Sequence, residues 1–183
     1  MMRLIKDFPE KTAEFETLHR DHHKELYRFV FRLLGDADDA DDVLQDTYIK
    51  LHSQFQQGVD IQEPRAWLFR VAGNSCYTLL KRRETWRQMV RKIPLAERLL
   101  PGPAPAETVD AEESEIRREQ ERMMRHAYGC LRIRDRLALE LFHSGLSYDE
   151  IAASLGVGKG SVGKLLTRAR RRLELAIKRG ERE

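Results

Sequence analysis

Basic and hydroxyl side chains recur along the segment from residue 159 to residue 171. At helical spacing, Lys164, Thr167 and Arg171 fall on one face. Ammonium and guanidinium groups bind phosphate oxygens. These groups, and hydroxyl groups as well, can also hydrogen-bond to base edges in a DNA groove. The segment is therefore a candidate nucleic-acid interface. Its candidate contact residues are Lys159, Ser161, Lys164, Thr167, Arg168 and Arg171.

The residues before and within this segment have the pattern of a helix, a tight turn and a second helix. Ser147 and Glu150 form a Ser-x-x-Glu capping box, and Gly156 permits a sharp turn. With a basic outer face on the second helix, this order is typical of a helix-turn-helix. An αα-hairpin with a solvated basic face is the alternative. The residues that we expect the second helix to bury are Val162, Leu166, Ala169 and Leu173.

A run of aspartates lies between residues 36 and 46 and contains no basic residue. Such a patch cannot favour DNA and requires a basic protein surface as its partner. Favourable placement of acids at a helix N-terminus, where they complement the helix dipole, would explain the first aspartates but not Asp46. A calcium loop is disfavoured, because its glycine and its terminal glutamate are missing. The six acids are Asp36, Asp38, Asp39, Asp41, Asp42 and Asp46.

Metal-binding and catalytic patterns are weak. His19 and His23 are four residues apart, as zinc ligands on a helix can be, but no acid or cysteine completes a set at ligand spacing. A partner contact or a structural role is the preferred interpretation of these histidines. We find no nucleophile elbow, phosphate-binding loop or metal motif, so we expect neither a metal, nor a cofactor, nor enzymatic activity.

Hydrophobic spacing predicts an all-α fold. An apolar stripe over residues 12–34 ends at Gly35, and Asp38 is the expected N-cap of a second helix. Residues 54–63 are expected to form a loop, and Pro64 fits the first position of a third helix. On this third helix we expect six residues to face the core, namely Trp67, Leu68, Val71, Ala72, Ser75 and Leu79.

Composition divides the chain into two small helical domains. Residues 93–114 contain four of the six prolines and a cluster of acids, which is typical of an extended linker. We therefore predict domains at 1–92 and 115–183, with the helix-turn-helix in the second. Residues 127–183 hold twelve basic and seven acidic side chains, a net charge of +5, and are the candidate footprint of a polyanion.

The remaining features predict a cytoplasmic protein without membrane insertion. Cys76 and Cys130 are isolated thiols, which fits a reducing compartment better than a disulfide framework. No apolar stretch approaches the length of a membrane span, and the N-terminus lacks the apolar core of a signal peptide.

Three stretches, in this order, resemble the extracytoplasmic-function sigma factors of the sigma-70 family. The first is DDADDVLQDTY at residues 38–48, and the second is WLFRVAGN at residues 67–74. The third begins with GLSYDEIA at residues 145–152 and continues with LGV at 155–157, GSV at 160–162 and RAR at 168–170. The resemblance covers nearly the whole chain, with the predicted linker between its two halves.

The resemblance implies a subunit that binds core RNA polymerase and directs it to promoter DNA. The acid-rich helix would dock on the clamp coiled coil of the β′ subunit, and a second contact would involve the β flap. The helix from Trp67 to Arg83 and the loop before it would read and open the minus-ten element, with Asn74 at an unstacked base. The implied polymerase-binding residues are Asp42, Gln45, Asp46 and Ile49. The implied minus-ten residues are Arg70, Asn74, Tyr77, Lys81, Arg82 and Arg83.

The same resemblance assigns the helix-turn-helix to the minus-thirty-five element and implies control by an anti-sigma protein that covers both domains. The linker would pass toward the RNA exit path. This sequence departs from the family where Gly163 and Leu165 replace frequent basic residues, and where Gly158 replaces a usual cap. These differences put the usual upstream base contacts in doubt.

Two other functions compete with this interpretation. A helix-turn-helix regulator that binds operators directly would resemble residues 137–178, but it would lack the acidic helix followed by the WLFR helix. A nucleic-acid-processing enzyme is disfavoured because no catalytic motif is found. The N-terminal half therefore favours a sigma factor.

Overall fold

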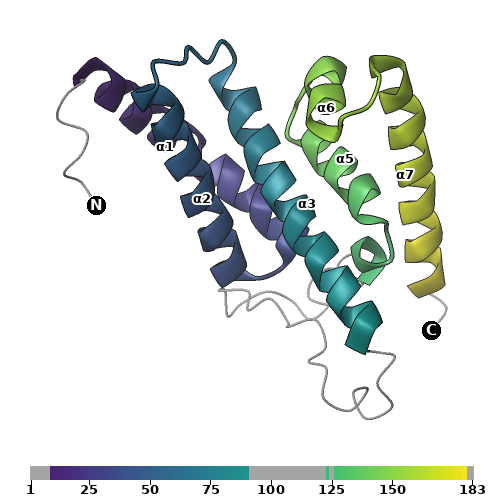
Figure 1. Cartoon of the computed structure of the whole chain (residues 1–183). Helices are drawn as coiled ribbons and strands as arrows, with labels where there is room; N and C mark the ends of the chain where they lie inside the picture. The colour runs from purple at the N-terminus through teal and green to yellow at the C-terminus, as the bar shows by residue number, and fades with distance from the viewer. Residues whose placement is uncertain (1–8, 91–122, 124–125, 181–183) are drawn as a thin grey trace, which may run out of the picture. The chain divides into compact units, whose positions relative to one another are not determined.

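The computed structural model describes residues 9–90, 123 and 126–180. Every regular element in these ranges is a helix, so the predicted all-α class is confirmed (Figure 1). The described helices group into two compact units, Met1–Cys76 and Tyr77–Glu183, whose boundary falls within one long helix. The predicted linker at 93–114 lies outside the described residues, and the division at residues 92 and 115 stays a prediction. The helices are α1 (Pro9–Leu34), α2 (Ala37–Gln56), α3 (Pro64–Val90), α5 (Ile133–His143), α6 (Tyr148–Leu155) and α7 (Lys159–Gly180).

A two-residue connection joins α1 to α2. Gly35 has φ +70°, a left-handed conformation that glycine adopts without steric cost, and its N–H donates to the Phe31 carbonyl at 2.7 Å. Asp36 caps α2 by accepting a hydrogen bond from the Asp39 N–H at 3.0 Å. The predicted cap, Asp38, was therefore wrong by two residues, because the chain turns directly after the glycine and leaves Asp38 in the first turn.

The core of the first unit consists of one buried stripe from each helix. Phe29 of α1 and Phe69 of α3 meet edge to face, with ring centroids 5.0 Å apart. Such an aromatic pair contributes about 0.5–1.5 kcal/mol beyond the burial of its area. The buried core residues are Leu26, Phe29, Val30 and Leu33 of α1, Ala40, Val43, Leu44, Thr47, Tyr48, Leu51 and Phe55 of α2, and Leu68, Phe69, Ala72 and Cys76 of α3.

Two expectations about this core require correction. The third helix buries Leu68 and Ala72 as predicted, but with them it buries Phe69 and Cys76. The predicted stripe was therefore rotated by about one residue, and four of its members are only half-buried: Trp67, Val71, Ser75 and Leu79. Residues 54–63 were expected to be a loop, but α2 continues to Gln56. The continuation is stabilised because Phe55, only 5% exposed, packs into the core.

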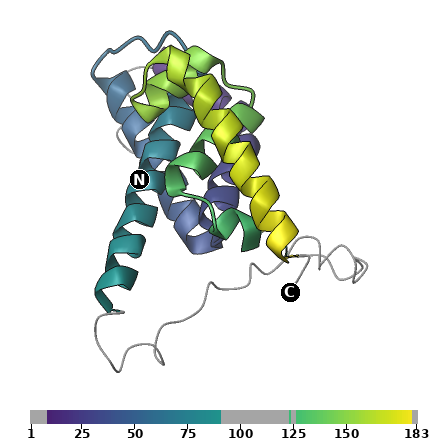
Figure 2. The same cartoon turned by 90° about the vertical axis from the view of Figure 1, so that its right-hand side faces the viewer.

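The second unit contains the predicted helix-turn-helix. Ser147 accepts a hydrogen bond from the Glu150 N–H at 3.3 Å, while the Glu150 carboxylate accepts one from the Ser147 N–H at 2.6 Å, which completes the capping box. Gly156 ends α6 in the left-handed conformation, with φ +60°. α7 then packs along both α5 and α6 (Figure 2).

The buried stripe of α7 largely matches its prediction. Val162, Leu166 and Ala169 are buried as expected, but Leu173 is only half-buried. Leu165, which stands where the family often has a basic residue, is only 6% exposed and belongs to the core. Helical geometry explains this burial, because Leu165 lies next to Val162 and Leu166 on the helix surface, and both of these residues are buried.

Histidines from α1 stack against a tyrosine from α2. The rings of His19 and His23 are 4.7 Å apart, and the His19 ring lies 4.6 Å from that of Tyr48. Burial, followed by the neighbouring charge of His23, lowers the pKa of His19 below 6.5. Burial also raises the pKa of Tyr48 to about 12, so its hydroxyl stays protonated. The predicted structural role of these histidines agrees with this packing.

We predict that acid destabilises the first unit through His19. Because the folded state lowers the pKa of His19, it binds fewer protons than the unfolded chain, and the free energy of unfolding falls as pH decreases from about 7 to 5. His19→Gln should reduce this dependence, whereas His143→Gln, at an exposed position on α5, should not. Urea unfolding, followed by circular dichroism at several pH values, measures the pH dependence of the free energy of unfolding. An unchanged pH dependence in His19→Gln would contradict the prediction.

Candidate binding surfaces

The outer side of α2 is an acidic face, made of Asp38, Asp41, Asp42, Gln45, Asp46 and Ile49. All six side chains are exposed, and Ile49 keeps 45% of its surface accessible. The opposite side of the helix is buried. There, the hydroxyl of buried Thr47 donates to the Val43 carbonyl at 2.7 Å, so its polar group needs no partner outside the helix.

The charge of the acidic face is not neutralised within the described part of the chain. Asp41, Asp42 and Asp46 form no ion pair with any described residue. The single lysine of α2, Lys50, points to α3, where its ammonium donates to the Ser75 hydroxyl at 3.3 Å. Four predicted docking residues, at positions 42, 45, 46 and 49, have the spacing of one helical stripe. The face thus combines uncompensated negative charge with one exposed isoleucine.

Polar and basic side chains also follow one stripe of α3. Arg70, Asn74 and Lys81 are exposed and Tyr77 is half-buried, at the spacing of successive helical turns. Lys81 pairs with Glu84 at 2.7 Å, and this hydrogen bond raises the pKa of Lys81. Exposed pairs of this kind contribute little stability, so a phosphate could replace Glu84 at small cost.

Not all of the residues predicted to contact the minus-ten element lie on this stripe. At about 100° per residue, Arg83 lies on the opposite side of the helix from Asn74. Arg83 is half-buried and already has an interaction within the protein. Arg82 is exposed and lies between the two sides. The structure therefore brings together Arg70, Asn74, Tyr77 and Lys81, but not Arg83.

An ion pair and a ring contact hold the start of α3 in place. The Arg65 guanidinium donates to both carboxylate oxygens of Glu25, at 2.6 and 3.4 Å. The same guanidinium lies 5.0 Å from the centroid of the Phe69 ring, within reach of a cation–π interaction. Neither Arg65 nor Glu25 was selected from the sequence, because their contact joins residues forty positions apart.

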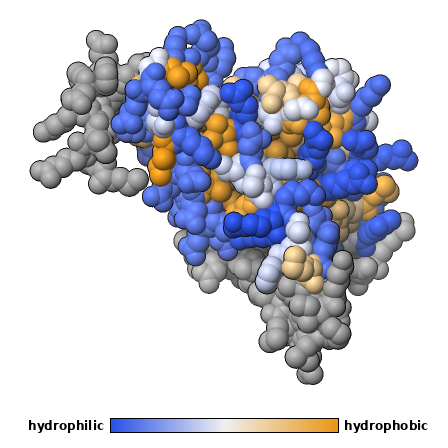
Figure 3. Space-filling view, in the orientation of Figure 1, coloured by the Kyte–Doolittle hydropathy of each residue, from blue (hydrophilic) through white to orange (hydrophobic). Residues whose placement is uncertain are grey.

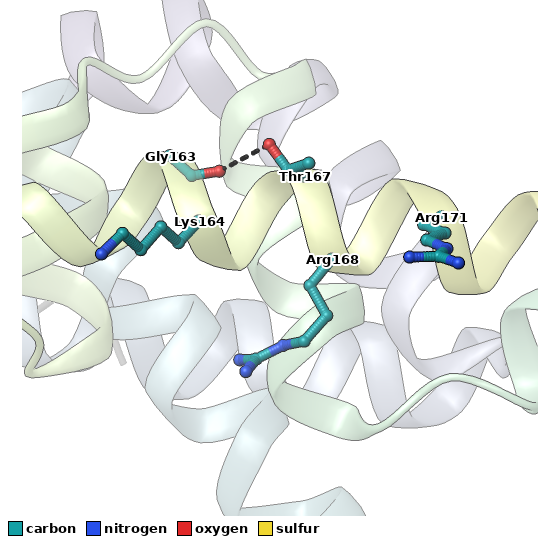
Figure 4. Close-up of a pocket in the computed structure, with 5 residues that line it drawn as sticks. All are labelled: Gly163, Lys164, Thr167, Arg168 and Arg171. Atoms are coloured by element: carbon teal, nitrogen blue, oxygen red, sulfur yellow. Dashed lines mark hydrogen bonds between the residues drawn. The ribbon is translucent and has the colours of Figure 1, made fainter.

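On the outer side of α7, an open depression is lined by Gly163, Lys164, Thr167, Arg168 and Arg171 (Figure 4). We call it the α7 depression. The Thr167 hydroxyl donates to the Gly163 carbonyl at 2.9 Å, so its proton is already used within the helix. All of the candidate DNA-binding residues on this helix are exposed. Of these, Lys159 forms an ion pair with Asp149 of α6 at 2.6 Å.

Other arginines of the second unit serve its packing. Arg172 of α7 forms an ion pair with Asp135 of α5, whose side chain is only 2% exposed. Arg134 donates to the Leu155 carbonyl at 2.5 Å, at the end of α6. Arg170 lies 4.8 Å from the centroid of the Phe142 ring. The net charge of +5 therefore does not show which of the cations are available to a partner, because three of these arginines already have contacts within the protein.

The surface seen in Figure 3 is mostly hydrophilic over the described helices, with small separate hydrophobic patches. None of the described helices is long and apolar enough to cross a membrane. Within the described ranges, His19 and His23 are not joined by a third histidine, cysteine or acid that could complete a metal site.

Comparison with known proteins determines the family. The chain matches the family model of Sigma-70 region 2 over residues 18–87 and that of Sigma-70 region 4 over residues 121–173. It is 31% identical to the ferric citrate uptake sigma factor FecI of Escherichia coli (strain K12) over 156 residues, which is 85% of this chain and 86% of FecI. It is 30% identical to the ECF RNA polymerase sigma factor SigM of Mycobacterium tuberculosis (strain H37Rv) over 87% of this chain and 74% of SigM. The chain belongs to the extracytoplasmic-function sigma factors.

This sigma factor is a transcription-initiation factor that directs promoter-specific initiation by RNA polymerase. Its fold is also similar to a solved structure, that of the sigma factor RpoE in complex with the anti-sigma factor NepR from Bartonella quintana. The TM-score is 0.67 at 23% identity, and the match covers 90% of this chain and 97% of RpoE.

We predict that Arg172→Met destabilises the second unit of this sigma factor. The substitution leaves the carboxylate of Asp135 buried without its partner, which costs about 3 kcal/mol when a buried pair is broken. Urea unfolding measures the loss. Arg171→Met, one residue away and exposed, should change stability by less than about 0.5 kcal/mol.

The double variant Asp135→Leu with Arg172→Met tests the cause. Because it removes the unpaired charge, it should be more stable than Arg172→Met alone. A double variant that is as unstable as the single one, or less stable, would show that packing rather than charge is responsible.

Proposed function

We propose that this sigma factor uses three separate surfaces for its three contacts: the acidic face of α2 for core polymerase, the exposed stripe of α3 for the minus-ten element, and α7 for the minus-thirty-five element. The observation that carries the proposal is the acidic face, because its charge has no counterpart within the described residues and repels DNA. Only a basic protein surface complements it.

The polymerase contact is proposed for Asp42, Gln45, Asp46 and Ile49, with the clamp coiled coil of β′ as the partner. Two carboxylates would pair with basic side chains, while Ile49 would supply the apolar centre that protein interfaces usually have. The family membership supports this assignment, and the exposure of all four residues is compatible with it. The contact with the β flap is proposed for the second domain on the family resemblance alone.

The minus-ten contact is proposed for Arg70, Asn74, Tyr77, Lys81 and Arg82. Arg83 lies away from this stripe, so we include it only as a residue that contacts a DNA phosphate beside the stripe. An amide can hydrogen-bond the edge of an unstacked base, and a tyrosine ring can stack on one. Arginine and lysine then hold the phosphates on either side, which gives binding its dependence on salt.

The minus-thirty-five contact is proposed for the outer residues of α7. We assign base readout to Lys164 and phosphate contact to Arg171, with Arg168 beside them. Lys159 can contribute only by exchanging Asp149 for a phosphate, and Ser161 remains exposed for such a contact. Since its proton is used by the Gly163 carbonyl, Thr167 would offer its methyl group and oxygen lone pairs rather than a donor.

We further propose domains at 1–92 and 115–183, joined by a linker at 93–114 that passes toward the RNA exit path, in a cytoplasmic protein. The family matches at 18–87 and 121–173 fall inside these domains and support the division. An anti-sigma protein that covers both domains is proposed as the regulator. The similarity in fold to RpoE, which was solved with its anti-sigma factor NepR, supports such a partner.

We predict that Asp42→Arg combined with Asp46→Arg abolishes promoter-specific run-off transcription with purified core polymerase. Loss of one partner from a buried charge pair costs about 2–5 kcal/mol at an interface, and charge reversal adds repulsion. The control is Glu16→Arg with Asp21→Arg, an equal charge change on exposed positions of α1. Unchanged core affinity in the α2 variant, with circular dichroism like that of the wild type, would refute the proposed docking face.

We predict that Asn74→Ala impairs promoter opening more than duplex binding, because the proposed base contact forms only with unstacked DNA. Permanganate footprinting should show about tenfold less opened promoter, which corresponds to about 1.4 kcal/mol. Arg87→Ala, on the other side of α3, is the control and should open normally. An Asn74→Ala variant that loses duplex binding and opening equally would place Asn74 in the initial contact instead.

A further inference from the structure

The start of α7 contains more glycine than its fold requires. Gly158, Gly160 and Gly163 all have negative φ values, which any residue adopts. A Cβ atom at Gly158 or Gly160 would meet no atom within 4 Å. At Gly163 it would lie 3.8 Å from a ring carbon of Tyr148, an ordinary van der Waals contact. Alanine is more favourable than glycine inside a helix, so Gly160 and Gly163 reduce the stability of α7 without a packing reason.

The position of these glycines relates them to the basic residues. Gly160 precedes Lys164, Thr167 and Arg171 by four, seven and eleven residues, so it lies on the same stripe of α7. Gly163 lies at the edge of this stripe, between it and Tyr148, and lines the α7 depression (Figure 4). The helix backbone therefore lacks side chains at Gly160 and Gly163, next to the residues along α7 that carry the cations.

The charges around the depression fit an anion. Lys164, Arg168 and Arg171 form no ion pair with other described residues, and no acid lines the depression. The Gly163 carbonyl oxygen would otherwise repel an anion, but it accepts the hydrogen bond from Thr167. A phosphodiester group could thus approach the backbone of α7 closely, with three cations spread along the helix beside it.

We propose that Gly163 is a close-approach position for the DNA sugar–phosphate backbone, which enters the α7 depression and contacts the helix where a side chain would obstruct it. Gly160 extends this bare surface by one turn. The proposal rests on the proposed role of α7 in DNA binding. It adds that affinity for duplex DNA is limited by side-chain volume at this glycine and not only by charge.

The test is Gly163→Ala in the full chain, compared with the wild type for thermal stability and for binding to short duplexes of several unrelated sequences by fluorescence anisotropy. The melting temperature should rise by a few degrees, because alanine favours the helix and adds a contact with Tyr148. Affinity should fall about tenfold on every sequence. The slope of affinity against salt concentration should not change, because no cation is lost.

Gly180→Ala, at the end of the same helix and away from the α7 depression, is the control, since a Cβ there meets nothing within 4 Å. It should leave duplex affinity unchanged. Equal affinities for Gly163→Ala and the wild type would overturn the inference. A loss confined to one sequence would overturn it as well, because that result indicates a base contact rather than a phosphate contact.

A second variant separates this inference from the proposed function. Lys164→Ala with Arg171→Ala should weaken duplex binding and reduce the salt slope by about one unit for each phosphate contact. If this variant binds like the wild type, α7 is not the DNA-binding surface and both ideas fail. If it binds weakly while Gly163→Ala binds normally, only the close-approach inference fails.

Discussion

The structure depends on the burial of one narrow apolar stripe along each helix. Most of the aliphatic and aromatic residues of the described helices lie on the packed sides, and this packing fixes the rotation of each helix about its axis. Rotation in turn decides which charged residues face outward. On α2, the burial of Val43, Thr47 and Tyr48 is the reason that Asp42 and Asp46 are exposed together. The interfaces are thus a consequence of core packing.

The arginines of the second unit illustrate the same constraint. Arg170, Arg171 and Arg172 are consecutive, yet they point in three directions because successive residues of a helix are separated by about 100°. Arg170 covers the Phe142 ring, Arg172 neutralises buried Asp135, and Arg171 remains at the surface. The pair with Asp135 ties α7 to α5, and it thereby holds the outer residues of α7 in one orientation. Stability and DNA binding consequently use neighbouring cations for different purposes.

Much of the fold could be predicted from the sequence because the strongest signals are local. The capping box at Ser147 and the left-handed glycines at positions 35 and 156 involve residues within four positions of each other, and they were found where expected. Predictions that depended on helix rotation were less reliable. Phe69, Cys76 and Leu165 were missing from the predicted buried stripes, because mixed apolar and polar residues permit more than one such stripe on a helix. Only packing against another helix selects between such stripes.

The sequence by itself determined the helical class, the helix-turn-helix, the acidic segment and the family, since each of these is written in the order and spacing of nearby residues. The tertiary structure alone decided which cations are available to a partner. Arg65 with Glu25 and Arg172 with Asp135 are joined across 40 and 37 residues, so no local pattern reveals them. It likewise showed that Gly163 is bare without a packing reason. That conclusion required the positions of neighbouring side chains, which depend on how α6 and α7 pack together.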